Sequence, residues 1–373
     1  MRIAQIAPLY ESCPPQLYGG TERVVFYLTE ELVRLGHDVT LFASGDSQTR
    51  ARLVPGCRRA LRFDPDVIDP LVHHMVMFSR LMRQASSFDI LHFHTDYLHY
   101  AAFGAGPVPM VTTLHGRQDL ADLAVLYDEF DRIPLVSISA NQSTALPQAN
   151  WLGTVYHGLP SDLLPYGEGD GGYLAFVGRI SPEKRLDRAI LIAQAAGLPL
   201  KVAAKIDRAD LVYFHEMIEP LLSGPGVEFV GEIDEAQKRH FLGRARALLF
   251  PIDWPEPFGL VMIEAMACGT PVLAFRRGAV PEVIDNGISG ITVDSMEEAH
   301  AALPTVLSLD RRKVRAAFEA RFTAERMARD YLDLYENLVH PVQSRRPKAA
   351  SLVTKPAADP YPGLTVHSAT GTA

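Results

Sequence analysis

The chain has 373 residues, of which 47% are hydrophobic and 21% are charged, so it is long enough for two domains with apolar cores. It carries 36 Lys and Arg residues against 44 Asp and Glu residues, and the net charge of −8 argues against a nucleic-acid partner. The three cysteines are scattered, and no apolar run is long enough to span a membrane. We therefore expect a reduced, cytoplasmic protein without structural zinc.

Strand and helix patterns alternate along the first half, which is typical of a parallel α/β architecture. The opening run Met1–Tyr10 is broken by Gln5 and Pro8, so it indicates a first strand and not a signal peptide. The patterns predict a helix over Thr21–Leu35 and strands over Arg2–Ala7, Asp38–Ala43, Ile90–His94, Val108–Leu114, Leu135–Ile138 and Gly153–Tyr156.

A polar, glycine-rich segment, Pro165–Gly172, interrupts this alternation and predicts a hinge linker. The pattern then resumes with strands over Tyr173–Val177, Leu200–Ala204, Val227–Val230, Ala247–Ile252 and Pro271–Phe275 and helices over Glu297–Leu307 and Thr323–Leu338. The segment 340–373 is rich in Pro, Ala, Ser and Thr, and we expect a disordered tail there. We predict one domain over residues 1–164 and a second over residues 173–322.

The most unusual residue of the second half is Glu264, inside the apolar stretch Leu260–Cys268 that predicts a helix buried on all sides. An unpaired carboxylate there costs on the order of several kcal/mol. No basic residue at helical spacing relieves it, so its partner must come from outside the helix, and a pair of ligand hydroxyls is one candidate. Glu256, eight residues earlier, can face the same cleft. The alternative is that Glu264 caps a neighbouring backbone and Glu256 is solvated.

A second group of polar residues opens the second domain. Ser181-Pro182-Glu183 has the pattern of a helix start, which places Lys184 in the first turn of a helix reaching about Ala196. Arg179 leaves the carboxyl end of the preceding strand, where open α/β sheets bind ligands. A helix N-terminus with a guanidinium and an ammonium fits a diphosphate clamp. Alternatively, Lys184 pairs with a surface carboxylate and Arg179 fills an interdomain gap.

Two features of the first domain suit a ligand site at the same cleft. Gly19 and Gly20 precede a helix and allow close approach of backbone to a ligand, although a tight turn is the favoured interpretation of the glycine pair alone. The loop lacks the GxGxxG spacing of a dinucleotide fold, which weakens a dehydrogenase interpretation. His115 follows the strand Val111–Leu114 and lies at the carboxyl edge of the sheet, where a lone histidine more often has a structural role.

Two short motifs raise the question of a metal. His92 and His94 alternate along one strand and point to one face, as in some metal-dependent hydrolases, but no later His and Asp residues complete such a site. Asp64-Pro65-Asp66 has the D-x-D pattern of a metal-holding motif, but its surroundings favour a turn. We therefore expect no metal.

Together, G-G before the first helix, His115-Gly116, G-R-x4-K and E-P-F-G-x4-E-A-M-A-C-G-T-P-V resemble the group-one retaining glycosyltransferases over roughly residues 1–338. The block from Glu256 to Glu264 is the most specific part. The resemblance implies an α/β GT-B fold, with two Rossmann-like domains facing across a cleft. It also implies that the second domain holds a nucleotide sugar and that the last helix, Thr323–Leu338, crosses back onto the first domain.

The resemblance also implies roles for the matching residues. Arg179 and Lys184 would neutralise the donor diphosphate, Glu264 would bind ribose hydroxyls and Glu256 would hold donor-sugar hydroxyls. The remaining contacts to sugar, phosphate or acceptor are assigned to Gly19, Gly20, His94, His115, Lys205 and the backbone N–H groups of Phe258, Gly259 and Leu260. His115, Arg179, Lys184 and Glu256 are the predicted catalytic residues, and His94 lies on the acceptor side.

Two segments depart from the family pattern. Ala203–Asp207 stands where many relatives have a glycine-rich turn, and because base recognition lies nearby, the sequence does not decide between uridine, guanosine and adenosine. Arg277–Glu282 stands where relatives commonly have G-G-x-P-E, so the local shape near the donor is expected to differ.

The resemblance implies a metal-independent, retaining hexosyltransferase that needs no cofactor and uses a nucleotide-diphosphate sugar, for which UDP-glucose is our first choice. The alternatives are a sugar-nucleotide epimerase or phosphorylase on the same fold, a non-catalytic nucleotide-sugar-binding protein and, last, a metal-dependent hydrolase. The acceptor and the oligomeric state cannot be read from the sequence. Phe78–Arg83 is compatible with peripheral membrane contact, although an ordinary helix face is the favoured interpretation.

Overall fold

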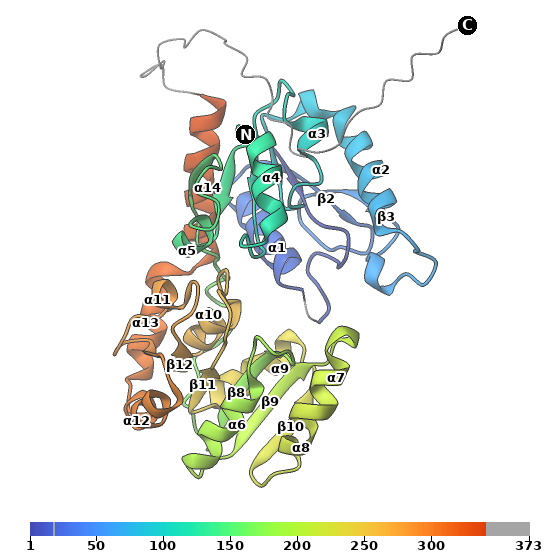
Figure 1. The fold of residues 1–373 in the computed structure, drawn as a ribbon. Helices are drawn as coiled ribbons and strands as arrows, with labels where there is room; N and C mark the ends of the chain where they lie inside the picture. The colour runs from blue at the N-terminus through green and yellow to red at the C-terminus, as the bar shows by residue number, and fades with distance from the viewer. Residues whose placement is uncertain (18, 341–373) are drawn as a thin grey trace, which may run out of the picture.

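The computed structural model describes residues 1–17 and 19–340, which form two parallel α/β units, one above the other in Figure 1. The first unit contains a seven-stranded parallel sheet in the order β3-β2-β1-β4-β5-β6-β7. Its strands are β1 (Arg2–Ile6), β2 (Asp38–Ser44), β3 (Arg52–Cys57), β4 (Ile90–Phe93), β5 (Met110–Thr113), β6 (Leu135–Ser137) and β7 (Trp151–Thr154). Its helices are α1 (Gly20–Arg34), α2 (Pro70–Met82), α3 (Tyr100–Phe103), α4 (Ala121–Glu129) and α5 (Ala140–Ser143).

The second unit contains a six-stranded parallel sheet in the order β10-β9-β8-β11-β12-β13. Its strands are β8 (Leu174–Arg179), β9 (Leu200–Lys205), β10 (Val227–Gly231), β11 (Ala247–Phe250), β12 (Val272–Phe275) and β13 (Gly290–Val293). The helices that follow β7 in the chain are α6 (Leu186–Ala195), α7 (Leu211–Tyr213), α8 (Glu219–Leu222), α9 (Glu235–Arg244), α10 (Leu260–Ala267), α11 (Val280–Val283), α12 (Met296–Leu307), α13 (Arg311–Arg321) and α14 (Ala324–Val339).

Both sheets have the buried central strands that a parallel architecture requires. Strands β4, β5, β11 and β12 are buried along their whole length, because such a sheet is covered on both faces and its strands read as continuous apolar runs. The strand order reverses between β1 and β4 in the first sheet and between β8 and β11 in the second. Ligands of open α/β sheets bind outside the carboxyl ends of the strands at such a point.

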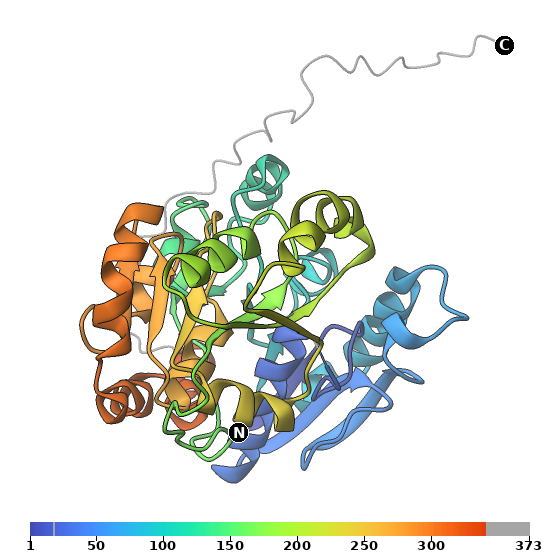
Figure 2. The ribbon, with the colours of Figure 1, turned by 90° about the horizontal axis from the view of Figure 1, so that it is seen from below.

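Every strand predicted from the sequence is present, with bounds shifted by one to a few residues. Two edge strands were not predicted. β3 contains Pro55 and Gly56, which argue against a central strand but are tolerated at an edge, and β13 is only four residues long. Seen from below, α2 and β3 lie at the margin of the molecule, away from the second unit (Figure 2).

The last helix, α14, lies beside the first unit and packs against α1 (Figure 1). Thr323 caps it, accepting a hydrogen bond from the Arg326 N–H at 3.2 Å. On either side of the cap, the Leu159 N–H donates to the Phe322 carbonyl and the Leu159 carbonyl accepts from the Ala324 N–H. The chain therefore passes between the units twice, at two backbone segments that hydrogen-bond to each other.

The predicted linker, Pro165–Gly172, contains no helix or strand. Three of its glycine N–H groups donate to carbonyls of the second unit, at Cys268, Gly243 and Arg244. The segment is therefore fixed along the second unit, and its role as a hinge stays a prediction. The predicted tail lies outside the described residues, apart from His340. No helix of residues 1–17 and 19–340 combines the length and the apolar character needed to cross a membrane.

Candidate active site

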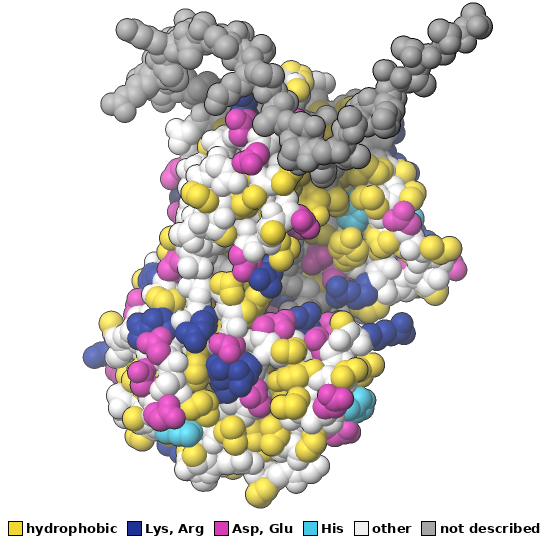
Figure 3. Space-filling model, viewed as in Figure 1, with side chains coloured by type: hydrophobic (Ala, Val, Ile, Leu, Met, Phe, Trp, Pro, Cys, Tyr) yellow, Lys and Arg dark blue, Asp and Glu magenta, His cyan; other side chains and the backbone are white. Residues whose placement is uncertain are grey.

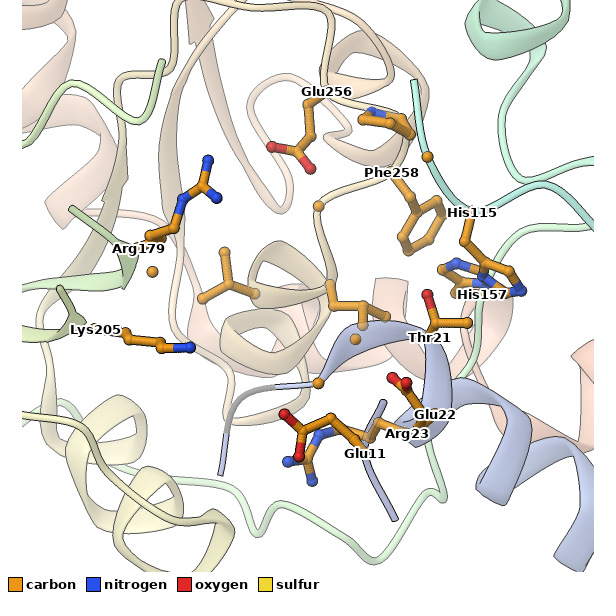
Figure 4. A pocket seen from close by; sticks show the side chains of 18 of the residues that line it. Glu11, Thr21, Glu22, Arg23, His115, His157, Arg179, Lys205, Glu256 and Phe258 are labelled. Carbon is orange, nitrogen blue, oxygen red and sulfur yellow. The ribbon is translucent and has the colours of Figure 1, made fainter. Parts of the chain in front are cut away.

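A cavity of about 740 Å³ lies between the two units, within the size range of small-molecule sites. In the space-filling view, Lys and Arg side chains lie on both sides of the gap between the units (Figure 3). Every site residue predicted from the sequence lines this cavity: Gly19, Gly20, His94, His115, Arg179, Lys184, Lys205, Glu256, Phe258, Gly259, Leu260 and Glu264. Figure 4 shows Arg179 and Glu256 on one side of it and Glu11 and Glu22 on the other.

The position of the cavity follows from the sheet topology. His94 directly follows β4 and Arg179 ends β8, so both lie at the carboxyl ends of strands beside a reversal of strand order. Glu256 and Phe258 lie in the loop between β11 and α10, on the other side of the reversal in the second sheet. The two sheets therefore present their ligand-binding edges to the same space.

One prediction about Lys184 is wrong. Residues 181–184 form a turn, and α6 begins only at Leu186, so Lys184 does not lie in the first turn of a helix. The helix is delayed because Arg185, its N-cap, adopts a left-handed backbone with φ of 53° and provides no side-chain cap. A phosphate clamp here would depend on side-chain charge and not on the amide groups of a helix end.

Lys184 forms an ion pair with Glu256, and neither side chain is more than 15% exposed. The Trp254 ring N–H donates to the same Glu256 carboxylate at 2.9 Å, and the Lys184 ammonium lies 4.9 Å from the Trp254 ring centroid. The partner of Lys184 is therefore a carboxylate of the cavity wall, not the surface carboxylate of the alternative interpretation.

Glu264 has a partner from outside its helix, as predicted, but that partner is a basic side chain of the protein and not a ligand hydroxyl. The Lys238 ammonium, on α9, donates to the Glu264 carboxylate at 2.7 Å. The side chains are 13% and 6% exposed, so the pair relieves most of the cost of a lone buried acid. The proposed contact of Glu264 with ligand hydroxyls stays a prediction.

The other two predicted cations also face acids. Arg179 pairs with Glu183 and lies 3.4 Å from a carboxylate oxygen of Asp210. Lys205 lies 3.0 Å from Asp207. The wall of the second unit is therefore a set of ion pairs, in which an anionic ligand would replace protein carboxylates as the partner of each cation.

The backbone at Gly278 packs closely against the segment that carries Glu256. Its backbone φ is +57°, and a Cβ atom there would lie 2.3 Å from the Glu256 backbone nitrogen. The following Ala279 N–H donates to the Glu256 carbonyl at 2.9 Å. The segment Arg277–Glu282 departs from G-G-x-P-E, but it keeps Gly278, the position where a glycine is needed for both the left-handed backbone and the close approach.

Packing within the protein explains Gly19. A Cβ atom at this position would lie 2.7 Å from the Cβ of Pro15, whereas one at Gly20 would contact only Leu260, across the cleft, at 3.6 Å. Close approach of a ligand is therefore not needed to explain the first glycine of the pair.

His94 and His115 belong to one buried hydrogen-bonded chain. Gln5 donates to the Tyr335 hydroxyl at 3.0 Å, and its amide oxygen lies 2.9 Å from His94 Nε2. His94 Nε2 then carries the hydrogen, so its Nδ1 accepts from His115 Nε2 at 2.9 Å. This leaves His115 Nδ1 as a bare acceptor, with no hydrogen-bond partner among the described residues. Burial lowers the pKa of His115 to about 3, so this imidazole is neutral.

His92 serves structure, not metal binding. Its two ring nitrogens lie 2.6 Å from the Tyr335 hydroxyl and 2.7 Å from the Thr113 hydroxyl, so both are occupied. Asp64 and Asp66 both pair with Arg58, in keeping with turn chemistry. Within the described part of the chain, no group of three or more His, Cys, Asp and Glu side chains is arranged to hold a metal ion.

Several residues that line the cavity were not singled out from the sequence. They include Glu11, Glu22, Arg23, Lys238 and Trp254. Glu22 follows the predicted glycine pair by two residues, but an acid in the first turn of a helix is ordinary, and only its burial distinguishes it. Nothing in the local pattern of α9 indicates that Lys238 reaches Glu264.

Comparisons with known proteins agree with this geometry. A family profile described as "Glycosyl transferases group 1" matches residues 167–321, and one described as "Glycosyltransferase Family 4" matches residues 18–152. The chain is 25% identical to a glycogen synthase of Mycobacterium tuberculosis over 384 residues, covering 89% of this chain and 91% of that protein.

Two further similarities come from a second relative and a solved structure. A phosphatidyl-myo-inositol mannosyltransferase of Mycolicibacterium smegmatis is 27% identical over 365 residues, covering 88% of this chain and 90% of that protein. The crystal structure of HepE from Anabaena in complex with UDP and glucose matches with a TM-score of 0.71 at 18% identity, covering 91% of this chain and 100% of that chain.

Proposed function

Because this chain belongs to the group-1 glycosyltransferases and has the GT-B fold, it is a glycosyltransferase, and we propose that it transfers a hexose from a nucleotide-diphosphate sugar to a hydroxyl-bearing acceptor. We further propose that the transfer retains the anomeric configuration and needs neither a metal nor a cofactor. UDP-glucose is the first choice of donor, because HepE is described in complex with UDP and glucose. A mannose nucleotide is the second, because one relative is a mannosyltransferase.

The observation that carries the proposal is the cluster of cations on one wall of the cavity. Arg179, Lys184 and Lys205 all line it from the second unit. In glycosyl transfer the sugar gains oxocarbenium character while the leaving nucleotide diphosphate gains negative charge. Fixed cations that meet such charge are each worth roughly 10²–10³ in rate. These three residues therefore suit the leaving group of a nucleotide sugar.

Donor binding in this scheme exchanges one set of ionic partners for another. The diphosphate would take Lys184 from Glu256, which frees the Glu256 carboxylate to accept hydrogen bonds from sugar hydroxyls. Glu264 would keep Lys238 at one carboxylate oxygen and accept the ribose hydroxyls at the other. Neither change leaves a buried charge without a partner, which keeps the cost of binding low.

Retention is proposed to occur by attack on the face of the sugar from which the diphosphate leaves. The bond between the acceptor oxygen and the anomeric carbon forms as the bond from that carbon to the phosphate oxygen breaks, and the acceptor proton passes to the leaving phosphate. The neutral His115 suits a position beside the reacting carbon, because it places no positive charge next to an oxocarbenium ion.

The test measures donor binding and transfer separately. UDP-glucose and GDP-mannose are titrated calorimetrically into the wild type, Lys184→Ala and Glu264→Ala, and release of nucleoside diphosphate is followed with an extract as acceptor pool. Lys201→Ala is the matched control, because Lys201 pairs with Glu228 and does not line the cavity. We expect both site variants to lose donor binding and transfer, and the control to keep both.

Near-normal transfer by either site variant would refute the proposal. Addition of EDTA should leave transfer unchanged, and its loss would contradict metal independence. Release of nucleoside diphosphate only when an acceptor is present separates a transferase from an epimerase. A visible absorbance band from bound pyridoxal phosphate would favour a phosphorylase instead.

A further inference from the structure

The part of the cavity wall formed by the first unit contains a buried acid that the proposed donor chemistry does not use. Glu22, in the first turn of α1, is 5% exposed and lines the cavity. The backbone N–H groups of Glu22 itself and Glu11 lie close enough to its carboxylate to lower its pKa. Among residues 1–17 and 19–340 it has no ion pair or hydrogen bond with another side chain.

The basic side chains near Glu22 are engaged elsewhere. Two arginines of the first unit line the cavity within the described residues, Arg23 and Arg62. Arg23 pairs with Glu235 of the second unit and donates to the Leu17 carbonyl, and Arg62 pairs with Glu11. A carboxylate buried without a cation is costly, so its retention at a cavity wall points to a partner that enters the cavity.

The protonation behaviour of Glu22 agrees with this interpretation. Burial raises its pKa to about 7, and the neighbouring Glu11 carboxylate adds to the rise while Arg62 opposes it. Cys13 also lies close to Glu22, whose negative charge adds to the rise that burial causes in the pKa of the Cys13 thiol. Hydrogen-bond donors supplied by a ligand would stabilise the ionised form, which the protein itself stabilises poorly.

We propose that Glu22 is an acceptor-binding residue whose carboxylate accepts a hydrogen bond from a hydroxyl group of an uncharged, polyhydroxylated acceptor, such as a sugar or a cyclitol. This inference rests on the proposed function, because it requires an acceptor in the cavity. Figure 4 shows Glu22 and Glu11 across the cavity from Arg179 and Glu256, so an acceptor held there faces the donor. A phosphorylated group beside Glu22 would meet a like charge, while Arg23 and Arg62 are already paired.

The experiment compares the full chain with Glu22→Gln, which keeps the shape of the side chain and removes its charge. The matched control is Glu31→Gln on the same helix, because Glu31 pairs with Arg34 and does not line the cavity. Donor binding is measured by calorimetry without acceptor, and thermal melting is measured at pH 8. Release of nucleoside diphosphate is then measured with two classes of probe.

The uncharged probes are myo-inositol, D-glucose and maltose, and the anionic probes are myo-inositol 1-phosphate and glucose 6-phosphate. A cell extract is also separated by anion exchange. The fraction that does not bind the column adds further uncharged probes, and the retained fraction adds further anionic probes. We expect wild-type release with the uncharged class. We expect Glu22→Gln to bind donor normally, to melt no lower than the wild type and to release nucleoside diphosphate roughly tenfold or more slowly, the cost of a hydrogen bond to a charged group.

Four results would overturn the inference. The first is that Glu22→Gln transfers at the wild-type rate. The second is that Glu22→Gln melts at a lower temperature than Glu31→Gln, which would indicate a structural role. The third is that the wild type transfers only to the anionic probes or fractions. No release with any probe or fraction, from a wild type that binds donor, would overturn it as well. Failure of the wild type to bind any nucleotide sugar is a separate result, obtained without acceptor, and refutes the proposed function itself.

Discussion

On the cavity wall of the second unit, two buried acids have cations as partners: Glu256 pairs with Lys184 and Glu264 with Lys238. On the wall of the first unit, Glu22 is equally buried, and no cation among residues 1–17 and 19–340 forms an ion pair with it. Paired charges suit a ligand that is itself charged, because one ionic partner replaces another. A lone carboxylate suits hydroxyl groups, which bring hydrogen-bond donors and no charge. The two walls therefore differ in the class of ligand that each can accept.

The largest effect is expected from Lys184→Ala. Under the proposed function it would remove a cation from the leaving group, and among the described residues it leaves Glu256 with the Trp254 N–H as its remaining partner. We expect transfer to fall by roughly 10²–10³ and the free energy of unfolding to fall by about 2–3 kcal/mol. Measurements of kcat and of urea unfolding check the two effects. The double variant Lys184→Met/Glu256→Gln should recover stability without recovering transfer, and transfer by the double variant would show that the pair serves only the fold.

The second prediction concerns the pH dependence that Glu22 gives to stability. Its pKa is about 7 in the folded protein and about 4.5 as a free side chain, so the folded state holds the proton more tightly. Stability is then lost as the pH rises from about 4.5 to about 7, by up to about 3 kcal/mol. Glu22→Gln should remove this loss. Urea unfolding should show that the free energy of unfolding changes less between pH 5 and pH 8 for Glu22→Gln than for the wild type. Equal changes in the two proteins would contradict the raised pKa of Glu22.

How much the sequence reveals also differs between the two walls. The cavity wall of the second unit could be predicted because Glu264 is conspicuous within a wholly apolar helix, and the resemblance supplied the spacing to Glu256 and Lys184. Glu22 could not, because an acid in the first turn of a helix looks ordinary until the loop after β1 buries it. A tertiary contact such as the one between Lys238 and Glu264 leaves no trace in local periodicity.

Local errors in the fold have similar causes. Ser181-Pro182-Glu183 has every feature of a helix start, but the left-handed backbone of Arg185 delays α6, and a single residue's φ is set by its surroundings. The edge strand β3 was hidden because Pro55 and Gly56 disrupt its pattern. The central strands were predictable because burial on both faces makes each a continuous apolar run.

The smallest effect is expected from Tyr335→Phe. This variant tests whether hydrogen bonds from α14 help to position the part of the cavity wall that the first unit forms. The Tyr335 hydroxyl is the link between His92 and Gln5, and Gln5 in turn fixes His94 and His115. Its loss leaves buried polar atoms without partners, so we expect unfolding to be easier by about 1–2 kcal/mol.

Because His115 then loses its fixed tautomer, kcat should also fall by roughly threefold to tenfold with little change in the KM for donor. Tyr331→Phe is the matched control. Its hydroxyl bonds to Thr113 on the far side of His92 and not to Gln5, so it should lower stability and leave kcat unchanged. Equal effects of the two variants on kcat would mean that α14 only supports the fold, and that the first-unit wall is set by its own sheet.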